Sequence, residues 1–345
     1  MSVPVLVLFG PTASGKTDIL LRLFGPEGLS PCGAEVVSAD SMQVYRGMDI
    51  GTAKPSPEER EKLPHHLIDI RNPDEQFNAG DFVRLAQEAV YDIAKRGRLP
   101  VVSGGTGFYL KNFITGLPEA PPSDAAVRAG LKTELQEKGA AFLMEELARV
   151  DPESARRIHI NDEYRLLRAL EVTRLSGLPL SSFKVSGAKP AGKGRGGAVS
   201  AFADDADAFR FLVFSLTRPR EELYRRINER CTAMFAQGLP GEVQGLYDAG
   251  FTPKDPGLRA IGYREFFIED ESSCSSSEHG KFRLSQDTAG VQALVAQNSR
   301  RYAKRQITFF SPTASSPLPQ VKYIDAGGDE EETAWRIYEE LCVII

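Results

Sequence analysis

The stretch "LFGPTASGKTD" at residues 8–18 decides the fold, because it carries the spacing G-x-x-x-x-G-K-T directly after an apolar run at residues 3–9. This spacing is typical of a glycine-rich loop between a buried strand and a helix. Gly10 and Gly15 allow a tight turn whose backbone N–H groups face an anion, and the helix beginning at about Gly15 adds its positive dipole end. Lys16 supplies a mobile positive charge, and Thr17 supplies a hydroxyl ligand for Mg²⁺. The pattern therefore predicts a cradle for a di- or triphosphate group.

Short apolar runs that are typical of buried strands recur along the chain, with helical patterns between several of them. The predicted strands span residues 3–9, 35–39, 67–70, 100–103 and 211–216. One connecting helix is clear, since Phe82, Leu85, Ala89 and Ile93 recur at helical spacing behind the N-cap residue Asn78. Asp81 completes the cap, and residues 95–97 end the helix. The alternation predicts an α/β fold, a P-loop NTPase-like parallel sheet flanked by helices.

The strand rhythm stops after a proline cluster at residues 118–122. Residues 124–176 are helical in pattern, with apolar positions at Leu131, Leu135, Phe142, Leu143 and Leu147. The glycine-rich segment 186–208 predicts a mobile loop, and residues 269–281 predict a second exposed loop. We therefore expect a first part of the core at 1–120, a helical insertion domain at 121–208, and the remainder of the core, with a basic C-terminal helix, at 209–345.

Composition limits the class of protein. The 345 residues include 42 Lys plus Arg and 47 Asp plus Glu, a net charge of −5, so a nucleic-acid site would be a local patch. Cys32, Cys231, Cys274 and Cys342 lie far apart, which argues against a disulfide framework or a zinc site and fits a reducing cytoplasm. The apolar start lacks the basic lead of a signal peptide, and no stretch is long enough to span a bilayer. Without an exposed heptad pattern or a long apolar edge, we expect a monomer.

Two acidic residues are candidates for chemistry beside the phosphate loop. A kinase or ATPase needs an acid at the end of another strand to hold Mg²⁺, and Asp69 in "HLIDI" is a weak match. Asp40 ends the run "EVVSA" and should share the crevice of the phosphate loop, because the carboxyl ends of parallel strands line one crevice. There it would serve as a base for a nucleophile or as an indirect Mg²⁺ ligand; the alternative is an N-cap of a short helix.

Eight blocks of the sequence resemble one family. They are "GPTASGKT", "DSMQVYRGMDIGTAKP", "PHHLIDI", "GGTGFYLK", "RLLRALEV", "LYRRINER", "AIGYRE" and "RRYAKRQITFF", and they run from about residue 3 to residue 311. Their order and spacing are similar to those of the tRNA dimethylallyltransferases, also called tRNA isopentenyltransferases. The resemblance implies that a dimethylallyl group is moved from dimethylallyl pyrophosphate to the exocyclic amine of the adenine 3′-adjacent to the anticodon, with release of pyrophosphate.

The resemblance also implies roles for individual residues. The pyrophosphate would be held by Gly10, Thr12, Ala13, Ser14, Gly15, Lys16 and Thr17, with Mg²⁺ on Thr17. The catalytic residues would be Asp40 as general base, Thr17, Arg230 as a further cation at the pyrophosphate, and Thr106 on the tRNA-facing wall of the reaction channel. For Arg230, the pattern alone slightly favours a solvated arginine paired with Glu222 or Glu229. Arg226, one helical turn away, makes a like-charge pair with it that an anion would relieve.

A basic stripe on the last long helical segment suits an RNA backbone. Arg300, Arg301, Lys304 and Arg305 form it, although such faces are often simply solvated. The tRNA contacts implied by the resemblance are Asp40, Ser41, Met42, Gln43, Thr106, Arg128, Tyr164, Arg165, Arg168, Arg259, Gly262, Tyr263, Arg264, Lys304, Arg305 and Gln306. The chain departs from the family at residues 309–311, where Phe-Phe-Ser stands in place of Trp then Arg, so an aromatic ring is kept and a cation is missing.

Three other functions share parts of this pattern. A related adenylate isopentenyltransferase would prenylate a free nucleotide, but the helical insertion and the basic stripe favour a polymeric RNA. A small-molecule kinase would need Asp69, and a nucleotide-dependent RNA-binding module would not need Asp40. His65 and His66 are adjacent, so we expect structural or substrate-loop hydrogen bonds from them and no metal site.

Overall fold

The computed structural model describes residues 2–183, 209–269, 281–314 and 317–343. The chain forms two compact units, one from residues 1–114 and 189–345 and the other from residues 115–188. The predicted loop at 186–208, Cys274 and nearly all of the predicted loop at 269–281 lie outside the described residues.

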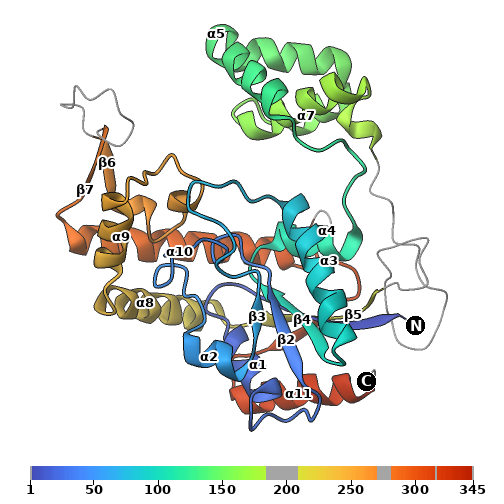
Figure 1. The fold of residues 1–345 in the computed structure, drawn as a ribbon, viewed down its shortest axis with the longest axis vertical. Coiled ribbons are helices and arrows are strands. Elements are labelled where there is room, and N and C mark those ends of the chain that lie inside the picture. Colours follow the sequence, from blue (N-terminus) through green and yellow to red (C-terminus); the bar gives the residue numbers. More distant parts are fainter. Residues whose placement is uncertain (1, 184–208, 270–280, 315–316, 344–345) are drawn as a thin grey trace. The chain divides into compact units, whose positions relative to one another are not determined.

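A parallel sheet forms the centre of the larger unit (Figure 1). Within the described residues it has six strands in the order β3-β2-β4-β1-β5-β8, and each neighbouring pair is parallel. The strands are β1 (Val3–Phe9), β2 (Ala34–Ser38), β3 (His65–His66), β4 (Leu99–Gly104), β5 (Phe209–Thr217) and β8 (Lys322–Asp325). The predicted α/β sheet is confirmed, and β1 lies at its centre between β4 and β5.

Helices cover both faces of this sheet. The helices of the larger unit are α1 (Lys16–Phe24), α2 (Pro57–Lys62), α3 (Ala79–Lys95), α4 (Gly107–Thr115), α8 (Arg220–Ala236), α9 (Leu239–Asp248), α10 (Thr288–Phe310) and α11 (Glu330–Cys342). On one face, Leu6 and Leu8 of β1 pack with Ile19 of α1 and Ile337 of α11. On the other face, α3 and α4 cover the sheet through rings such as Phe82 and Tyr109, whose centroids are 4.7 Å apart. The carboxyl ends of the strands remain open for a site.

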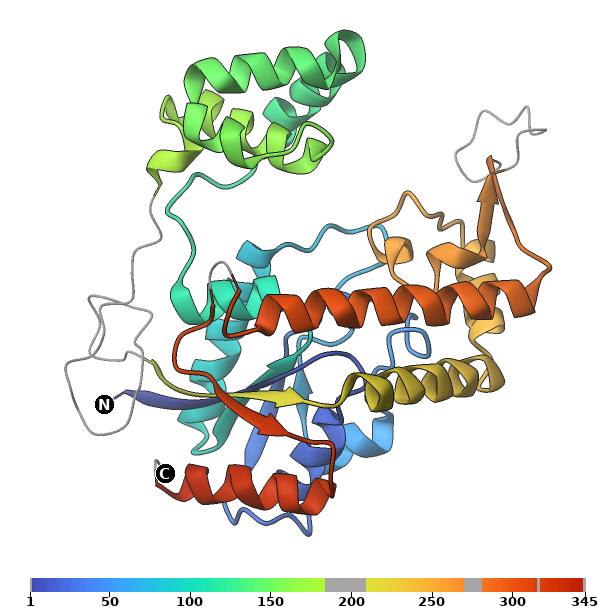
Figure 2. The same ribbon diagram turned by 180° about the vertical axis from the view of Figure 1, so that it is seen from behind.

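Two long helices, α8 and α10, lie side by side next to the sheet in both ribbon views (Figures 1 and 2). Leu223 and Ile227 of α8 pack against Ala303 of α10. Short 3₁₀ turns at Gly257–Arg259 and Arg264–Phe266 follow α9, and a hairpin of β6 (Phe267–Glu269) and β7 (Phe282–Leu284) precedes α10. The basic residues predicted to meet a ligand are therefore carried by helices that are packed against each other.

The start of α3 agrees with the predicted cap. The Asn78 side chain accepts hydrogen bonds from the N–H groups of Gly80 and Asp81, and the Asp81 carboxylate accepts one from the Asn78 N–H. This reciprocal capping box satisfies N–H groups that a helix start leaves without partners. The helix ends at Lys95, as the sequence predicts.

Two local predictions are wrong. Residues 67–70 are not a strand: Leu67 (φ 62°) and Asp69 (φ 57°) have left-handed backbone, and β3 is limited to His65–His66. The cause is tertiary, because the Asp69 carboxylate is bound by Lys54 and Arg60 at 2.6 and 3.1 Å. Phe142, predicted to be a core position, is 40% exposed.

The smaller unit is a helical cluster. It contains α5 (Ala125–Val150), α6 (Pro152–Arg157), α7 (Glu163–Ser176) and a 3₁₀ turn at Leu180–Ser182. Gly139 (φ 79°, ψ 165°) breaks α5, so the apolar spacing on its two sides belongs to two different helix registers, and Phe142 turns outward. Leu131, Leu143 and Leu166 form part of the core. None of the helices described in either unit is long and apolar enough to cross a membrane.

Candidate active site

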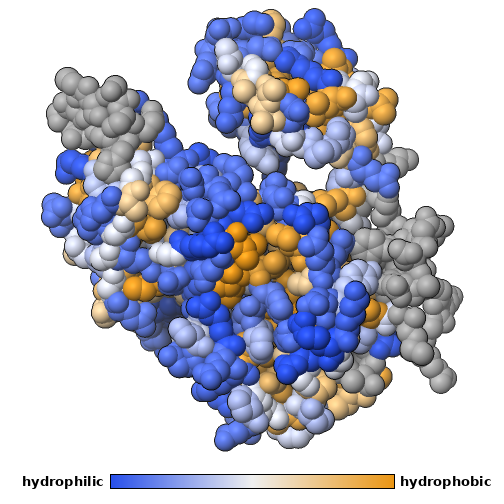
Figure 3. Space-filling model, viewed as in Figure 1, coloured by the Kyte–Doolittle hydropathy of each residue, from blue (hydrophilic) through white to orange (hydrophobic). Residues whose placement is uncertain are grey.

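A pocket of about 800 Å³ lies in the larger unit at the carboxyl end of the sheet. Its walls come from the phosphate loop after β1, the segment after β2, the loop after β4, and helices α8 and α10. On the face drawn in Figure 3, apolar side chains gather in the middle of this unit and are ringed by hydrophilic ones. The predicted site residues that line the pocket are Thr12, Ala13, Ser14, Gly15, Lys16, Thr17, Asp40, Ser41, Met42, Gln43, Arg230, Arg259, Arg264, Arg305 and Gln306.

The phosphate loop has the geometry of an anion cradle. Ala13 (φ 64°) and Gly15 (φ 92°) take left-handed backbone, which turns successive N–H groups to one side. Lys16 folds back over the loop, and its ammonium donates to the carbonyl oxygens of Gly10 and Pro11 at 3.1 and 3.0 Å. Burial, and then the nearby Arg230 charge, lower the pKa of Lys16 to about 8. An anion in the cradle would relieve both effects.

Arg230 reaches the same cradle from α8. Its Nη1 donates to Thr12 Oγ1 at 3.4 Å, and burial lowers the pKa of its guanidinium while the Asp40 charge opposes that shift. The acids that could have paired with it are used elsewhere: Glu222 binds Arg218 at 2.5 Å and Glu229 binds Arg225 at 2.8 Å. The alternative of an Arg230 paired with Glu222 or Glu229 is therefore wrong. Across the described residues, neither Lys16 nor Arg230 has a carboxylate within 4.0 Å of its nitrogens.

Two arginines, Arg218 and Arg226, bind the backbone of the phosphate loop. Nε of Arg226 donates to Ala13 O and Nε of Arg218 donates to Ser14 O, each at 3.0 Å. Both guanidinium groups approach the Glu330 carboxylate, at 3.4 and 3.6 Å, and Glu330 comes from the first turn of α11. The expected repulsion between Arg226 and Arg230 is thus relieved, because the Arg226 guanidinium is paired with Glu330, whereas the Arg230 guanidinium reaches Thr12. Sequence reasoning missed Arg218 and Glu330.

Asp40 lies at the end of β2 on the wall facing the cradle. Its Oδ1 accepts hydrogen bonds from the N–H groups of Met42 and Gln43, at 2.8 and 3.3 Å, within a turn and not a helix. The alternative role of Asp40 as an N-cap therefore accounts for Oδ1 only. Thr106 Oγ1 accepts from the Ser41 N–H at 3.0 Å, so Thr106 and Asp40 are tied together. Burial, and then the Asp40 charge, raise the pKa of the neighbouring Tyr302 to about 12.

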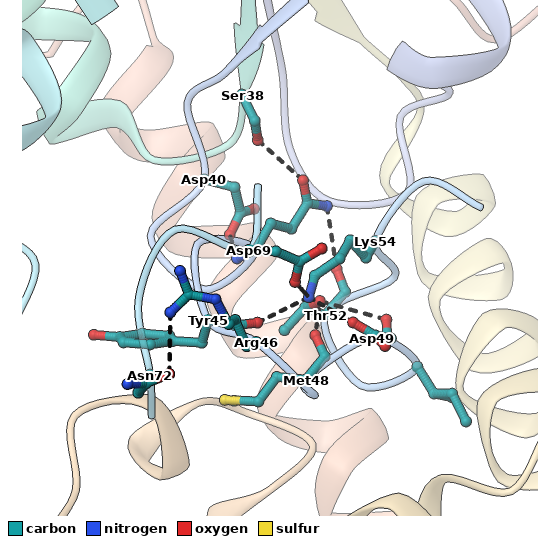
Figure 4. Close-up of polar contacts among 12 residues, drawn as sticks. Ser38, Asp40, Tyr45, Arg46, Met48, Asp49, Thr52, Lys54, Asp69 and Asn72 are labelled. Atoms are coloured by element: carbon teal, nitrogen blue, oxygen red, sulfur yellow. Dashed lines mark hydrogen bonds and ion pairs between the residues drawn. The ribbon is translucent and has the colours of Figure 1, made fainter. Parts of the chain in front are cut away.

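The segment from Ser38 to Asn72 beside Asp40 is held by a polar network (Figure 4). The Lys54 ammonium donates to Tyr45 O at 2.8 Å and contacts Asp49 and Asp69 at 2.5 and 2.6 Å, while its side chain is only 1% exposed. Asp69 is therefore used as a structural partner of Lys54. It cannot supply the Mg²⁺-holding acid that a kinase needs without breaking this contact.

A second acid, Glu242 of α9, fixes the same segment. Its carboxylate accepts hydrogen bonds from the N–H groups of residues 49–51 at 2.8–3.2 Å and from the Tyr263 hydroxyl at 2.6 Å. Tyr263 is fully buried, and Gln306 is 5% exposed. Both were predicted to contact tRNA, and this burial departs from that prediction: their side chains bind other parts of the protein.

Five basic residues that were predicted to meet RNA have exposed side chains, and three of them, Arg259, Arg264 and Arg305, also line the pocket. Arg259, Arg264, Arg301, Lys304 and Arg305 are exposed. The Arg305 guanidinium lies 5.6 Å from the centre of the Tyr302 ring. Phe310 is buried, with its ring 4.5 Å from that of Phe9, so of the two phenylalanines only Phe309 is partly exposed. Gly262 is buried and has left-handed backbone (φ 97°).

In the smaller unit, one buried acid organises the predicted basic contacts. Glu171 is fully buried and binds Arg128 at 3.1 Å and Arg168 at 2.8 Å. The Arg128 guanidinium lies 4.7 Å from the centre of the Tyr164 ring, which is 65% exposed. Arg165 pairs with Asp162 at 3.4 Å. An exposed aromatic ring beside fixed cations suits an unpaired base, and Glu171 escaped the sequence reasoning because an isolated Glu in a helix carries no signal.

The histidines act as predicted. The His66 ring binds Glu35 at 2.6 Å, and the His65 ring binds Leu63 O at 2.7 Å; burial lowers the pKa of His65. Within the described residues, no three His, Cys, Asp or Glu side chains converge as a metal-ligand group. A Mg²⁺ ion would therefore depend on the Thr17 hydroxyl and on phosphate oxygens of a ligand, and Thr17 lines the pocket where that is possible.

Comparison with known proteins adds a family. Residues 43–313 match the model of the IPP transferase family. The chain is 42% identical to the tRNA dimethylallyltransferase of Geobacter sulfurreducens over 321 residues, 93% of this chain and 91% of the relative. It is also 42% identical to that of Geobacillus thermodenitrificans, over 90% of this chain and 88% of the relative.

Solved structures agree with this match. The tRNA isopentenylpyrophosphate transferase from Bacillus halodurans superposes with a TM-score of 0.62 at 33% identity, covering 99% of this chain and 96% of that one. A eukaryotic dimethylallyltransferase acting on tRNA superposes with a TM-score of 0.71 at 23% identity, covering 99% of this chain and 78% of that one. The latter is a likeness of fold.

Proposed function

This chain belongs to the IPP transferase family, and we propose that it is a tRNA dimethylallyltransferase. In this proposal it transfers the dimethylallyl group of dimethylallyl pyrophosphate to the exocyclic amine of the adenine 3′-adjacent to the anticodon, and pyrophosphate is released. One observation carries the proposal: Lys16 and Arg230 face the pocket without a carboxylate partner in the described chain, opposite Asp40.

The donor would bind with its pyrophosphate in the cradle. The N–H groups of residues 13 and 15–17, the Lys16 ammonium and the Arg230 guanidinium would lie where negative charge builds up as the allylic C–O bond breaks. Mg²⁺, when bound to the Thr17 hydroxyl and to the phosphate oxygens, would supply further positive charge. The breaking bond leaves its electron pair on the pyrophosphate oxygen, so these groups stabilise the leaving group.

The acceptor would enter from the side of Asp40. The adenine amine is a poor nucleophile, and it must lose a proton as its nitrogen forms the new bond with the allylic carbon, because the nitrogen would otherwise carry a positive charge. Asp40 Oδ1 is used by the turn at Met42 and Gln43, which leaves Oδ2 to accept that proton. Thr106 fixes the neighbouring Ser41 and so helps to orient Asp40.

The RNA would be held by the exposed cations. Arg301, Lys304 and Arg305 suit the phosphate backbone. The Tyr164 ring beside Arg128 suits an unpaired base of the anticodon loop, and extruding such a base costs less than flipping one out of a duplex. The proposal takes the protein to act as a monomer in the cytoplasm.

The direct test is transfer of label. The protein is incubated with Mg²⁺, labelled dimethylallyl pyrophosphate and an unmodified anticodon stem-loop, with ATP and AMP as acceptors in parallel tubes. We expect label in the RNA only. Label in AMP alone would identify an adenylate isopentenyltransferase, and release of ADP with any acceptor would identify a kinase; either result would overturn the proposal.

A further inference from the structure

The Gln306 side chain connects two loops that follow the neighbouring strands β1 and β4. It comes from α10 and is 5% exposed. Its Oε1 accepts the Thr12 N–H at 2.8 Å, and its Nε2 donates to Gly105 O at 2.8 Å. Both ends of the amide are thus used within the protein, and one side chain joins the phosphate loop after β1 to the loop after β4.

On the donor side, the contact continues to Arg230. The Thr12 N–H is taken by Gln306 and is not available to a phosphate oxygen. The Thr12 hydroxyl accepts from Arg230 at 3.4 Å. A displacement of the Gln306 amide would therefore move Thr12, and with it the cation that faces the cradle.

On the acceptor side, the contact continues to Asp40. Gly105 is followed by Thr106, whose Oγ1 accepts the N–H of Ser41, the residue after Asp40. The Gln306 amide is packed tightly here: a Cβ on Gly105 would lie 2.5 Å from Gln306 Nε2. Gly105 and Gln306 are thus matched to each other, and the amide holds this loop against the phosphate loop.

We propose that Gln306 is a positioning residue, and that it sets the distance between the group that stabilises the leaving pyrophosphate and the base that serves the acceptor. The inference rests on the proposed function and deepens it. It differs from the direct tRNA contact that the resemblance implies for Gln306. Reactions of this kind depend on near-attack geometry, where a shift of about 1 Å costs about 100-fold in rate.

The first test is Gln306→Met, which keeps the length of the side chain and removes both hydrogen bonds. We expect kcat to fall about tenfold or more, the affinity for inorganic pyrophosphate with Mg²⁺ to weaken, and the affinity for the anticodon stem-loop to stay within twofold. The matched control is Gln297→Met, on the exposed face of the same helix, which should change none of these. A loss of stem-loop affinity with normal kcat would mean that Gln306 is a tRNA contact and would overturn the inference.

A second test does not depend on the behaviour of one variant. Gly105→Ala should lower kcat in the wild-type background, because its Cβ displaces the Gln306 amide. In a Gln306→Ala background the space is free, so the same substitution should have a much smaller effect. This non-additivity is the signature of a direct interaction. Additive effects in the two backgrounds would contradict the proposed link.

Different results would refute the transferase function and the positioning role of Gln306. Wild-type protein that binds pyrophosphate but transfers no label refutes the proposed function, and the Gln306 variants are then judged by pyrophosphate affinity alone. Wild-type protein that transfers label, together with a Gln306→Met variant of normal kcat and pyrophosphate affinity, refutes the positioning role while leaving the function in place.

Discussion

Two pairs of cations at the phosphate loop differ in their partners: Arg218 and Arg226 each bind a loop carbonyl and share the Glu330 carboxylate, whereas Lys16 and Arg230 bind no carboxylate of the described chain. Desolvated charge without a counter-ion is costly, so a protein keeps it only where a ligand will supply the opposite charge. The comparison separates structural cations from those that await an anion. Sequence alone does not make this separation, because Arg226 and Arg230 lie one helical turn apart on the same helix.

The largest effect is expected from Asp40, the pocket-side acid whose charge acts on both Lys16 and Arg230. Asp40→Asn keeps an oxygen for the turn at Met42 but removes the base, so turnover should fall about 1000-fold. Affinity for the anticodon stem-loop should stay within twofold. Single-turnover transfer and filter binding measure the two quantities; an unchanged rate would refute the assignment of the base.

The next largest effect is expected from Lys16, one of the two cations without a carboxylate partner in the described chain. Lys16→Ala should lower kcat/KM for the donor about 100-fold, because one group that stabilises the leaving pyrophosphate is lost. The midpoint of thermal unfolding should change little, because removal of a desolvated charge offsets the loss of the two hydrogen bonds from Lys16 to Gly10 O and Pro11 O. Arg220→Ala, at the exposed start of α8, is the control and should leave transfer unchanged. A large loss of stability in Lys16→Ala would place Lys16 among the structural cations.

Because the pKa of Lys16 is about 8, the affinity for pyrophosphate should depend on pH. In the free protein the ammonium is charged below pH 8 and loses its proton above it, whereas a bound anion favours the charged form. Binding above pH 8 must therefore take up a proton, and affinity for pyrophosphate should fall about tenfold between pH 7 and pH 9. Titration calorimetry across this range measures the effect. Lys16→Arg corrects for the titration of pyrophosphate itself, and an identical pH profile for both proteins would contradict the prediction.

The smallest effect on the reaction is expected from Glu330, the carboxylate that Arg218 and Arg226 share. Glu330→Gln leaves Arg218 and Arg226 without their shared carboxylate, so we expect a loss of about 1–2 kcal/mol in the free energy of unfolding and a few-fold rise in donor KM. Glu330→Asp should restore part of the stability. Glu331→Gln, an exposed acid in the same helical turn, is the control. Urea denaturation measures the stability, and initial rates measure kcat and KM. A Glu330→Gln variant with normal stability and a kcat about 100-fold lower would contradict this structural role.

The parts of the fold that the sequence predicts well are those set by neighbours in the chain. The phosphate loop is recognised from its own glycines and the adjoining strand and helix, and the α3 cap from Asn78 and Asp81. Residues 67–70 and Phe142 are mispredicted for different reasons. The first is pulled out of strand geometry by Lys54 and Arg60, and the second changes side because Gly139 interrupts its helix.

The parts of the site that the sequence misses are acids that act from a distance along the chain. Glu242 accepts hydrogen bonds from residues 49–51. Glu330 pairs with Arg218 and Arg226, the two arginines that bind the carbonyl groups of residues 13 and 14. A glutamate in the first turn of a helix is common for reasons of helix dipole alone, so its sequence gives no indication of a distant partner. The same holds for Gln306, whose partners Thr12 and Gly105 are identified only once β1 and β4 lie next to each other.

The position of Glu330 has a consequence for synthesis on the ribosome. The phosphate loop is among the first segments to be made, whereas Glu330, and β8, which pairs with β5, follow roughly 300 residues later, an interval of about 15 to 60 s at ordinary elongation rates. During that interval the loop lacks the carboxylate that sets its arginines. A nascent chain should therefore hold its phosphate ligand poorly until translation has passed α11.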